Sequence, residues 1–136
     1  MSFIVSQVMV VSIQVEFRED ELVAIVHMVG NPEASELEDT IRSAMIPILA
    51  KHQPETVNIV WDVRAFEWTF KQFIDFISLA RKRRADNETP MNFKQYYVGQ
   101  NTWAQNFRTW LKRNFNEDTG FFNELDEALI YIQKSA

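Results

Sequence analysis

The feature that most constrains the fold is an alternation between short β-branched segments and longer segments whose apolar residues recur at helical spacing. The first kind is typical of strands and the second of amphipathic helices. Strands are predicted at residues 9–17, 22–29, 57–62, 93–98 and 120–122. A helix is predicted after each of the last four strands, so the element order is β-β-α-β-α-β-α-β-α and the fold class is α/β.

The connections between these strands predict a mixed, largely parallel five-stranded sheet. Glu19, Asp20 and Glu21 form a short polar link between the first two strands, which therefore pair as an antiparallel hairpin. Each later strand is reached through a helix, which makes it parallel to the one before. The first and fourth strands keep a polar side that includes Gln14 and Lys94, so we expect helices mainly on one face of the sheet. The other face is a candidate surface for dimerisation or partner docking.

Local patterns predict how the helices begin and which faces they bury. Three helix starts carry the spacing of a capping box, in which two side chains bond the backbone at the helix N-terminus. The pairs are Ser35 with Glu38, Thr69 with Gln72, and Thr102 with Gln105. Pro47 lies inside the first helical pattern, which predicts a kink there or a helix that ends and restarts. The predicted buried face of the second helix consists of Phe70, Phe73, Ile74, Ile77 and Ala80.

Residues 1–136 are predicted to form one domain, because 136 residues with 46% hydrophobic side chains suffice for one core and not for two. The chain has no cysteine, which excludes a disulfide scaffold, a zinc site with thiolate ligands and a cysteine nucleophile. No basic residue precedes Arg18, and no apolar run reaches the ~20 residues needed to span a bilayer. We therefore expect a cytoplasmic protein with no membrane insertion.

The charge of the chain argues against a nucleic-acid partner, because the net charge is −5 and nucleic-acid-binding domains carry a basic excess. The main basic run is Arg81, Lys82, Arg83 and Arg84, at the predicted end of the second helix. Cations at that position offset the exposed carbonyl groups of a helix C-terminus, which is the structural interpretation of the run. A patch for an anionic partner is the alternative.

Asp62 is the most prominent candidate for chemistry, because it ends the third strand where ligand sites gather in open α/β sheets. Arg64 and Glu67 follow it closely. A carboxylate there can bind a metal, accept a phosphoryl group or hold a loop. A phosphoacceptor role like that in response regulators also needs an acidic pair after the first strand and a lysine near the last, and both are missing. The structural alternative is that Asp62 accepts backbone N–H groups or pairs with Arg64.

The remaining chemical motifs are sparse. His27 and His52 have no metal-ligand spacing between them. The chain also lacks the glycine-rich and nucleophile-elbow motifs of nucleotide-binding proteins and hydrolases. We therefore expect no enzymatic activity, no metal and no cofactor.

Aromatic residues are concentrated in the second helix and in the loop before it, in a chain with 11 Phe, 4 Trp and 3 Tyr. The structural interpretation is ordinary core packing. The alternative is a groove for a small apolar ligand. Its candidate lining residues are Phe66, Trp68, Phe76 and Trp103.

Three segments, taken with the opening hairpin, resemble the STAS domain of anti-sigma-factor antagonists, and in particular its divergent bacterial branch. They are residues 57–64 (VNIVWDVR), 97–104 (YVGQNTWA) and 121–129 (FFNELDEAL). The resemblance spans residues 8–133 and implies a STAS-like fold, which is also similar to that of CRAL-TRIO lipid-transfer domains. Antagonists that switch by phosphorylation carry Asp-Ser-Ser/Thr-Gly at the start of the second helix. Here residues 68–72 read WTFKQ, so Thr69 offers the only hydroxyl and the phosphoacceptor serine is missing.

The leading functional hypothesis is a non-enzymatic regulatory or interaction domain that resembles anti-sigma-factor antagonists. It implies a protein partner, or self-association as a homodimer, through a surface that includes Asp62, Arg64, Glu67 and Thr69. The alternative hypothesis is a binder of a small apolar or lipid-like ligand in the aromatic groove.

Overall fold

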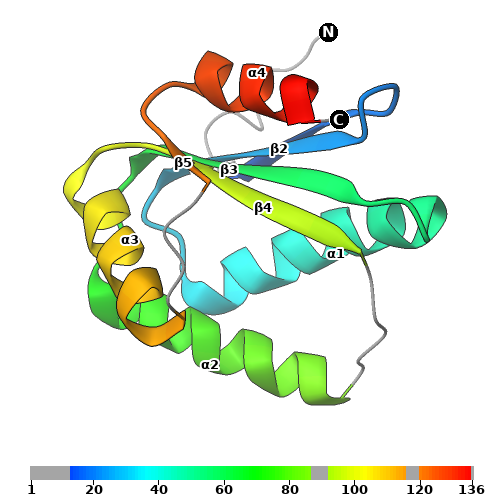
Figure 1. Ribbon diagram of the computed structural model, residues 1–136. Coiled ribbons are helices and arrows are strands. Elements are labelled where there is room, and N and C mark those ends of the chain that lie inside the picture. Colours follow the sequence, from blue (N-terminus) through cyan, green and yellow to red (C-terminus); the bar gives the residue numbers. More distant parts are fainter. Residues whose placement is uncertain (1–12, 87–91, 116–119, 136) are drawn as a thin grey trace, which may run out of the picture.

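The computed structural model of the protein describes residues 13–86, 92–115 and 120–135, and it has the predicted α/β architecture (Figure 1). The predicted strand residues 9–12 and loop residues 87–90 lie outside the described residues. The strands are β1 (Ile13–Arg18), β2 (Val23–Gly30), β3 (Val57–Phe66), β4 (Phe93–Val98) and β5 (Phe121–Phe122). The helices are α1 (Ala34–His52), α2 (Phe70–Asp86), α3 (Thr102–Phe115) and α4 (Leu125–Ser135).

The five strands form one mixed sheet in the order β1-β2-β3-β4-β5. β1 pairs with β2 as an antiparallel hairpin, with Ile13 opposite Met28, and all other neighbours are parallel. Each parallel connection moves the chain one strand further in the same direction, so right-handed crossovers place α1, α2 and α3 on the same face. α4 follows the last strand and packs on the other face, against β3, β4 and β5 (Figure 1). The predicted sheet, with helices mainly on one face, is confirmed.

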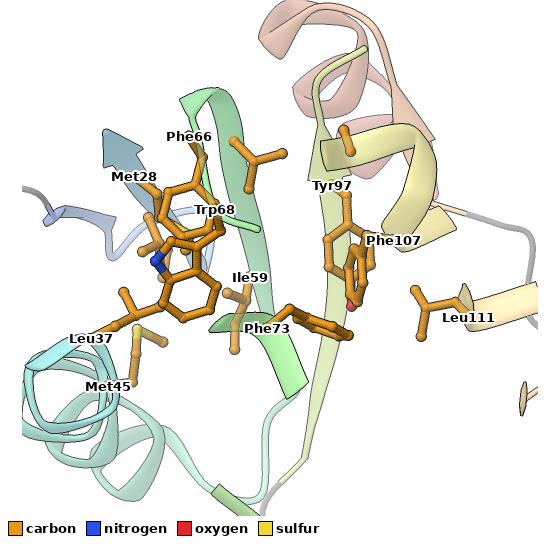
Figure 2. Close-up of a cluster of buried hydrophobic side chains, with 14 of the residues drawn as sticks. Met28, Leu37, Met45, Ile59, Phe66, Trp68, Phe73, Tyr97, Phe107 and Leu111 are labelled. Carbon is orange, nitrogen blue, oxygen red and sulfur yellow. The ribbon is translucent and has the colours of Figure 1, made fainter. Parts of the chain in front are cut away.

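Each face of the sheet has its own hydrophobic core, because successive side chains of a strand point to opposite faces. In β3, Ile59 and Val63 pack toward α1, α2 and α3, whereas Val60 packs toward α4. The larger core includes Met28, Leu37, Met45, Phe66, Trp68, Phe73, Tyr97, Phe107 and Leu111 (Figure 2). The smaller core comprises Val23, Ile25, Val60, Tyr96, Val98, Ala128 and Ile132.

β3 ends at Phe66 rather than at its predicted end, Asp62. Pairing with β2 extends the strand, because Val29 lies opposite Ala65 and Gly30 opposite Phe66, after an irregularity in register that follows His27. Asp62 therefore lies within β3, and the strand continues for four residues beyond it.

The predicted capping box of α2 is confirmed, and that of α1 is wrong. The backbone N–H of Thr69 donates to Gln72 Oε1 at 2.9 Å, and the Gln72 N–H donates to Thr69 Oγ1 at 3.2 Å. α1 begins at Ala34, so Ser35 already lies in its first turn, and the preceding Glu33 makes no side-chain capping bond.

The cap of α3 is Asn101 and not the predicted Thr102. Asn101 Oδ1 accepts the backbone N–H of Ala104 at 2.8 Å. The amide nitrogen of the same side chain donates to the carbonyl oxygens of Val63 at 2.8 Å and Phe66 at 3.1 Å. The Asn101 side chain can cap α3 with its oxygen and bond the end of β3 with its amide nitrogen at the same time. A threonine side chain has a single hydroxyl group and cannot make both sets of contacts.

α1 is continuous from Ala34 to His52, so the helix does not end and restart at Pro47. Pro47 is exposed, whereas Leu37, Met45 and Leu49 of the same helix are buried in the larger core. Packing of this apolar face stabilises the helix across the proline, because tertiary contacts supply most of the stability of a helix in a protein.

The buried face of α2 differs from the predicted one. Phe70 and Ile74 are 46% and 37% exposed, although the periodicity predicts them to be buried. Phe73 is buried, and Phe76 and Ile77 pack against the larger core. The helix is rotated so that Phe73 meets the rings of α3, and this leaves the first apolar pair facing outward.

Two glycines with positive φ differ in the space around them. Gly120 (φ +81°) precedes β5, and a Cβ there would lie 3.1 Å from the backbone oxygen of Gln95. Gly30 (φ +75°) ends β2, and its Cβ would meet no described atom within 4 Å. Side chains are strained at both positions, but of the two only Gly120 would also bring its Cβ into tight contact with backbone.

We expect Gly30→Ala to lower the free energy of unfolding by about 1 kcal/mol, from backbone strain alone. Gly120→Ala should lower it by about 2–3 kcal/mol, because the Gln95 carbonyl cannot move without disturbing β4. Urea denaturation of the two variants and the wild type measures both values. Equal losses in the two variants would contradict the close approach at Gly120.

Candidate functional site

A charged cluster lies on the α4 side of the sheet and consists of Glu16, His27, Asp62, Arg64 and Glu124. At its centre, the Asp62 carboxylate accepts hydrogen bonds from Arg64 Nε at 2.8 Å and Nη2 at 2.9 Å. The Arg64 backbone N–H donates to Asp62 Oδ1 at 3.3 Å. The structural interpretation of Asp62, in which it pairs with Arg64 and a backbone N–H, is confirmed.

His27 belongs to the charged cluster because the parallel register of β2 and β3 places it opposite Asp62. Its Nδ1 lies 2.8 Å from Asp62 Oδ2, and its Nε2 lies 3.7 Å from Glu16 Oε1. At the other end of the cluster, Arg64 Nη1 lies 3.9 Å from Glu124 Oε2, next to the start of α4. The cluster therefore links β1, β2, β3 and the segment that leads into α4.

The protonation of Asp62 follows from these contacts. Burial raises the pKa of its carboxyl group, but the hydrogen bonds from Arg64 and His27 more than offset this, so the pKa lies below its ordinary value. Asp62 is therefore ionised at neutral pH, with both carboxylate oxygens bonded within the chain. This arrangement suits a carboxylate that holds strands together, because an incoming metal or phosphoryl group would have to displace these partners.

An aromatic cavity of about 480 Å³ lies on the opposite side of the sheet, between the sheet and α1, α2 and α3. Alternate residues of the strands form one wall, among them Met28, Trp61, Val63 and Tyr97. The helices form the other walls with Leu37, Ile41, Phe73, Phe76, Ile77, Trp103, Phe107, Trp110 and Leu111. All four tryptophans of the chain line this cavity.

The four predicted groove residues, Phe66, Trp68, Phe76 and Trp103, all line the aromatic cavity. The Phe66 ring centroid lies 4.7 Å from that of Trp68 and 5.1 Å from that of Trp103. The Trp68 and Phe76 rings meet edge to face at 5.6 Å. The structure thus brings the four side chains together from β3, α2, α3 and the loop before α2.

Trp68 has a fixed orientation at one end of the cavity. Its indole N–H donates to the carbonyl oxygen of Pro32 at 2.7 Å, in the loop before α1. Figure 2 shows Trp68 close to Phe66 on one side of the core, with Tyr97 and Phe107 on the other. This wall is preorganised, because the polar end of the indole is bonded to backbone while its ring faces the core.

The residues that line the aromatic cavity are buried at the carboxyl ends of the strands, which we call its closed end, and exposed at the amino ends, which we call its open end. Phe66 and Trp68, at the closed end, are 1% and 5% exposed. Phe93, which begins β4, is 36% exposed, and the side chains of Arg81 and Gln95 that also line the cavity are exposed.

The predicted partner-binding residues lie in two different places. Asp62 and Arg64 belong to the charged cluster on the α4 side of the sheet. Glu67 and Thr69 line an edge crevice of about 350 Å³ between the start of α2 and the start of α3, together with Thr102. The structure therefore does not combine all four residues into one cleft.

Sequence reasoning missed several residues of the aromatic cavity. Trp61 and Val63 share the alternate positions of β3 that face the helices, and this period of two is the signal that could have found them. Arg81 lies two helical turns after Phe73, on the side of α2 that lines the cavity. Because it belongs to a basic run, the sequence pattern indicates an exposed cation and gives no sign of this position. The pairing of His27 with Asp62 has no local signal, because it depends on the register between two strands.

Within residues 13–86, 92–115 and 120–135, no group of three or more His, Asp and Glu side chains is arranged to hold a metal ion. None of the helices in these ranges is long and apolar enough to cross a membrane.

Comparisons of the chain with protein-family models, with curated proteins and with solved structures give no match. The STAS-like fold and the functions that it implies therefore stay predictions from the sequence.

The charged cluster makes stability depend on pH through Asp62. Because the pKa of Asp62 is lowered in the folded protein, its contribution is present above the pKa of the unfolded chain, near pH 4, and is lost as pH falls through the folded value. We expect Asp62→Asn to lower the free energy of unfolding by about 1–3 kcal/mol at pH 5. The difference from the wild type should shrink between pH 5 and pH 3.

Asp75→Asn is the matched control, because Asp75 is exposed and pairs with Lys71 along α2. It should change the free energy of unfolding by less than about 0.5 kcal/mol at any of these pH values. Urea denaturation at each pH gives all of the values. A constant difference between the wild type and Asp62→Asn from pH 5 to pH 3 would contradict the assignment.

Proposed function

We propose that this chain is a binding domain without catalytic activity, and that it holds a small apolar ligand in the aromatic cavity. The observation that carries this proposal is the cavity itself, a hollow of about 480 Å³ with predominantly apolar and aromatic walls. Its size lies within the range of about 300–1,000 Å³ that is usual for small-molecule sites.

Water is a poor occupant of such a space, because buried water needs two or more polar partners. The indole N–H groups of Trp61 and Trp68 are already donated, to Gln95 Oε1 at 3.0 Å and to the Pro32 carbonyl. Protein interiors also contain few voids larger than a water molecule. An apolar molecule that fills the cavity gains contacts that neither water nor the surrounding side chains supply.

The chemistry of the walls supports binding rather than catalysis. Among the described residues, those that line the cavity include no Ser, Thr, His, Asp, Glu or Lys, and the chain has no cysteine. Asp62, the buried carboxylate that bonds Arg64 and His27, lies on the other face of the sheet. A bound molecule in the aromatic cavity therefore meets no acid-base pair and no activated nucleophile among the residues that line it.

The neutral fluorescent probe N-phenyl-1-naphthylamine tests this proposal. We expect saturable binding to the wild type with a stoichiometry of one, accompanied by quenching of tryptophan emission. Ile77→Trp should weaken binding by about tenfold or more, because the indole occupies space in the cavity. Native mass spectrometry of freshly purified protein should also show the mass of a retained ligand.

The control variant is Ile46→Trp, which adds the same side chain at a 40% exposed position of α1 that does not line the cavity. It should bind the probe as the wild type does. No saturable binding to the wild type, or an equal loss in both variants, would contradict the proposal.

A second candidate function is a regulatory interaction domain of STAS-like fold, acting in the bacterial cytoplasm as the sequence resemblance implies. The exposed apolar pair Phe70 and Ile74 supports it, because the two lie one turn apart on the outer side of α2. Glu67 and Thr69 of the edge crevice immediately precede this pair. An apolar patch beside polar groups is typical of a protein-binding surface.

Photocrosslinking tests this surface. Phe70 is replaced by p-benzoylphenylalanine, and Tyr131, which is 51% exposed on α4, is replaced in the same way as a control. In the cells that produce the protein, we expect a crosslinked species of defined mass from position 70 and none from position 131. Mass spectrometry then shows whether the partner is another protein or a second copy. Equal crosslinking at both positions would contradict a specific surface on α2.

A further inference from the structure

We propose that the ligand of the aromatic cavity is a long-chain monocarboxylate, whose carboxylate binds Arg81 and whose apolar chain extends toward Phe66 and Trp68. This inference rests on the proposed function, because it requires that the cavity holds a ligand. It adds the chemical class of that ligand and the direction in which it binds.

The direction follows from the shape of the cavity. Phe66 and Trp68 close one end and are almost completely buried, so a group at that end meets only apolar surface. The open end contains the exposed side chains of Arg81, Gln95 and Phe93. A molecule with one polar head and one apolar chain matches this gradient only with its head at the open end.

The sign of the head group follows from Arg81. It is the only charged residue among the residues that line the cavity in the described part of the chain. No ion pair with an acidic side chain is found for it within the described residues, whereas Lys71 of the same helix pairs with Asp75 at 3.0 Å. A guanidinium at the mouth of an apolar cavity matches a carboxylate, which it can bind through two parallel hydrogen bonds.

Arg81 is the first residue of the basic run in α2. Lys82, Arg83 and Arg84 follow it within the same helix, so four consecutive positions carry positive charge. From the sequence, this run has two interpretations: cations that offset the carbonyl groups of a helix C-terminus, or a patch for an anionic partner. Arg81 is the member of this run that lines the cavity in the described part of the chain, and its guanidinium favours an anionic head over a cationic one.

The volume indicates the length of the apolar chain. A cavity of about 150 Å³ accommodates benzene, so about 480 Å³ accommodates roughly 15–20 non-hydrogen atoms at the same ratio. This corresponds to a straight acyl chain of about 12–16 carbons with its carboxylate at the mouth. Arg81, the one cation that lines the cavity within the described ranges, matches the single charge of such a monocarboxylate.

Four probes, each with a chain of twelve carbons counted from the head group and with different heads, test the inference: dodecanoate, dodecanol, dodecyl phosphate and dodecyltrimethylammonium. Binding is measured below the micelle concentration of each probe by isothermal titration calorimetry and by tryptophan emission, which reports on the cavity because all four tryptophans line it. We expect dodecanoate to bind about tenfold more tightly than dodecanol, and the cationic probe to bind most weakly.

The decisive variant is Arg81→Gln, with Lys82→Gln as the matched control on the neighbouring exposed position. Arg81→Gln should weaken dodecanoate binding about tenfold and leave dodecanol binding within about twofold of the wild type. Lys82→Gln should keep the binding of dodecanoate and of dodecanol within about twofold of the wild type. Any small loss of dodecanoate binding within that limit should disappear when salt is added, because salt screens exposed charges. Circular dichroism confirms that both variants are folded.

The remaining outcomes distinguish failure of the anionic head from failure of the ligand site itself. Dodecanol binding as tight as that of dodecanoate, or an equal loss of both probes in Arg81→Gln, overturns the anionic head while the apolar site stands. Tighter binding of dodecyl phosphate than of dodecanoate overturns the carboxylate. Failure of all four probes and of N-phenyl-1-naphthylamine overturns the proposed function together with this inference.

Discussion

Phe73 packs edge to face against three aromatic side chains of α3, and this contact sets how α2 and α3 stand over the sheet. Its ring centroid lies 5.9 Å from Trp103, 4.9 Å from Phe107 and 5.1 Å from Trp110, at interplanar angles of 79°, 69° and 85°. These separations lie within the range of about 4.5–7 Å that aromatic pairs prefer. Phe73 and the three rings of α3 line the aromatic cavity, together with Trp61 of β3.

Two sets of polar side-chain contacts join the strands and helices elsewhere in the domain. Asn101 joins the start of α3 to the end of β3, and Asp62 joins β3 to β2 through His27. The Asn101 contact lies at the carboxyl end of β3, where Phe66 and Trp68 also close the cavity, and the Asp62 contact lies four residues before that end on the other face of the sheet. A rigid closed end and an exposed open end give the site a direction, and the two proposals about its ligand depend on that difference.

The overall fold could be predicted because it depends on local periodicity. Alternation in β1 and helical spacing in α3 and α4 each identify an element from its own residues, and short connections leave few ways to assemble them. The four predicted groove residues do line one cavity. Phe66 and Trp68 are close in sequence, Phe76 lies in the second turn of α2, and Trp103 lies in the first turn of α3. Their role as a ligand site remains the proposal made above.

Other parts of the site could not be predicted, because they depend on how elements meet. The rotation of α2 about its axis buries Phe73 and exposes Phe70, although both lie on one apolar stripe of the helix. The choice of Asn101 over Thr102 as a cap depends on the carbonyl groups of β3, which are distant in sequence.

The sequence by itself determined the order of the elements, the mixed sheet and the side of each strand that is apolar, because these follow from the residue period within a segment. Only the tertiary structure decided that Asp62 meets His27, that Arg81 stands at the mouth of a cavity and that the cavity exists. The physical reason is that register, helix rotation and the volume left between packed elements arise from contacts between segments far apart in the chain, which no local pattern encodes.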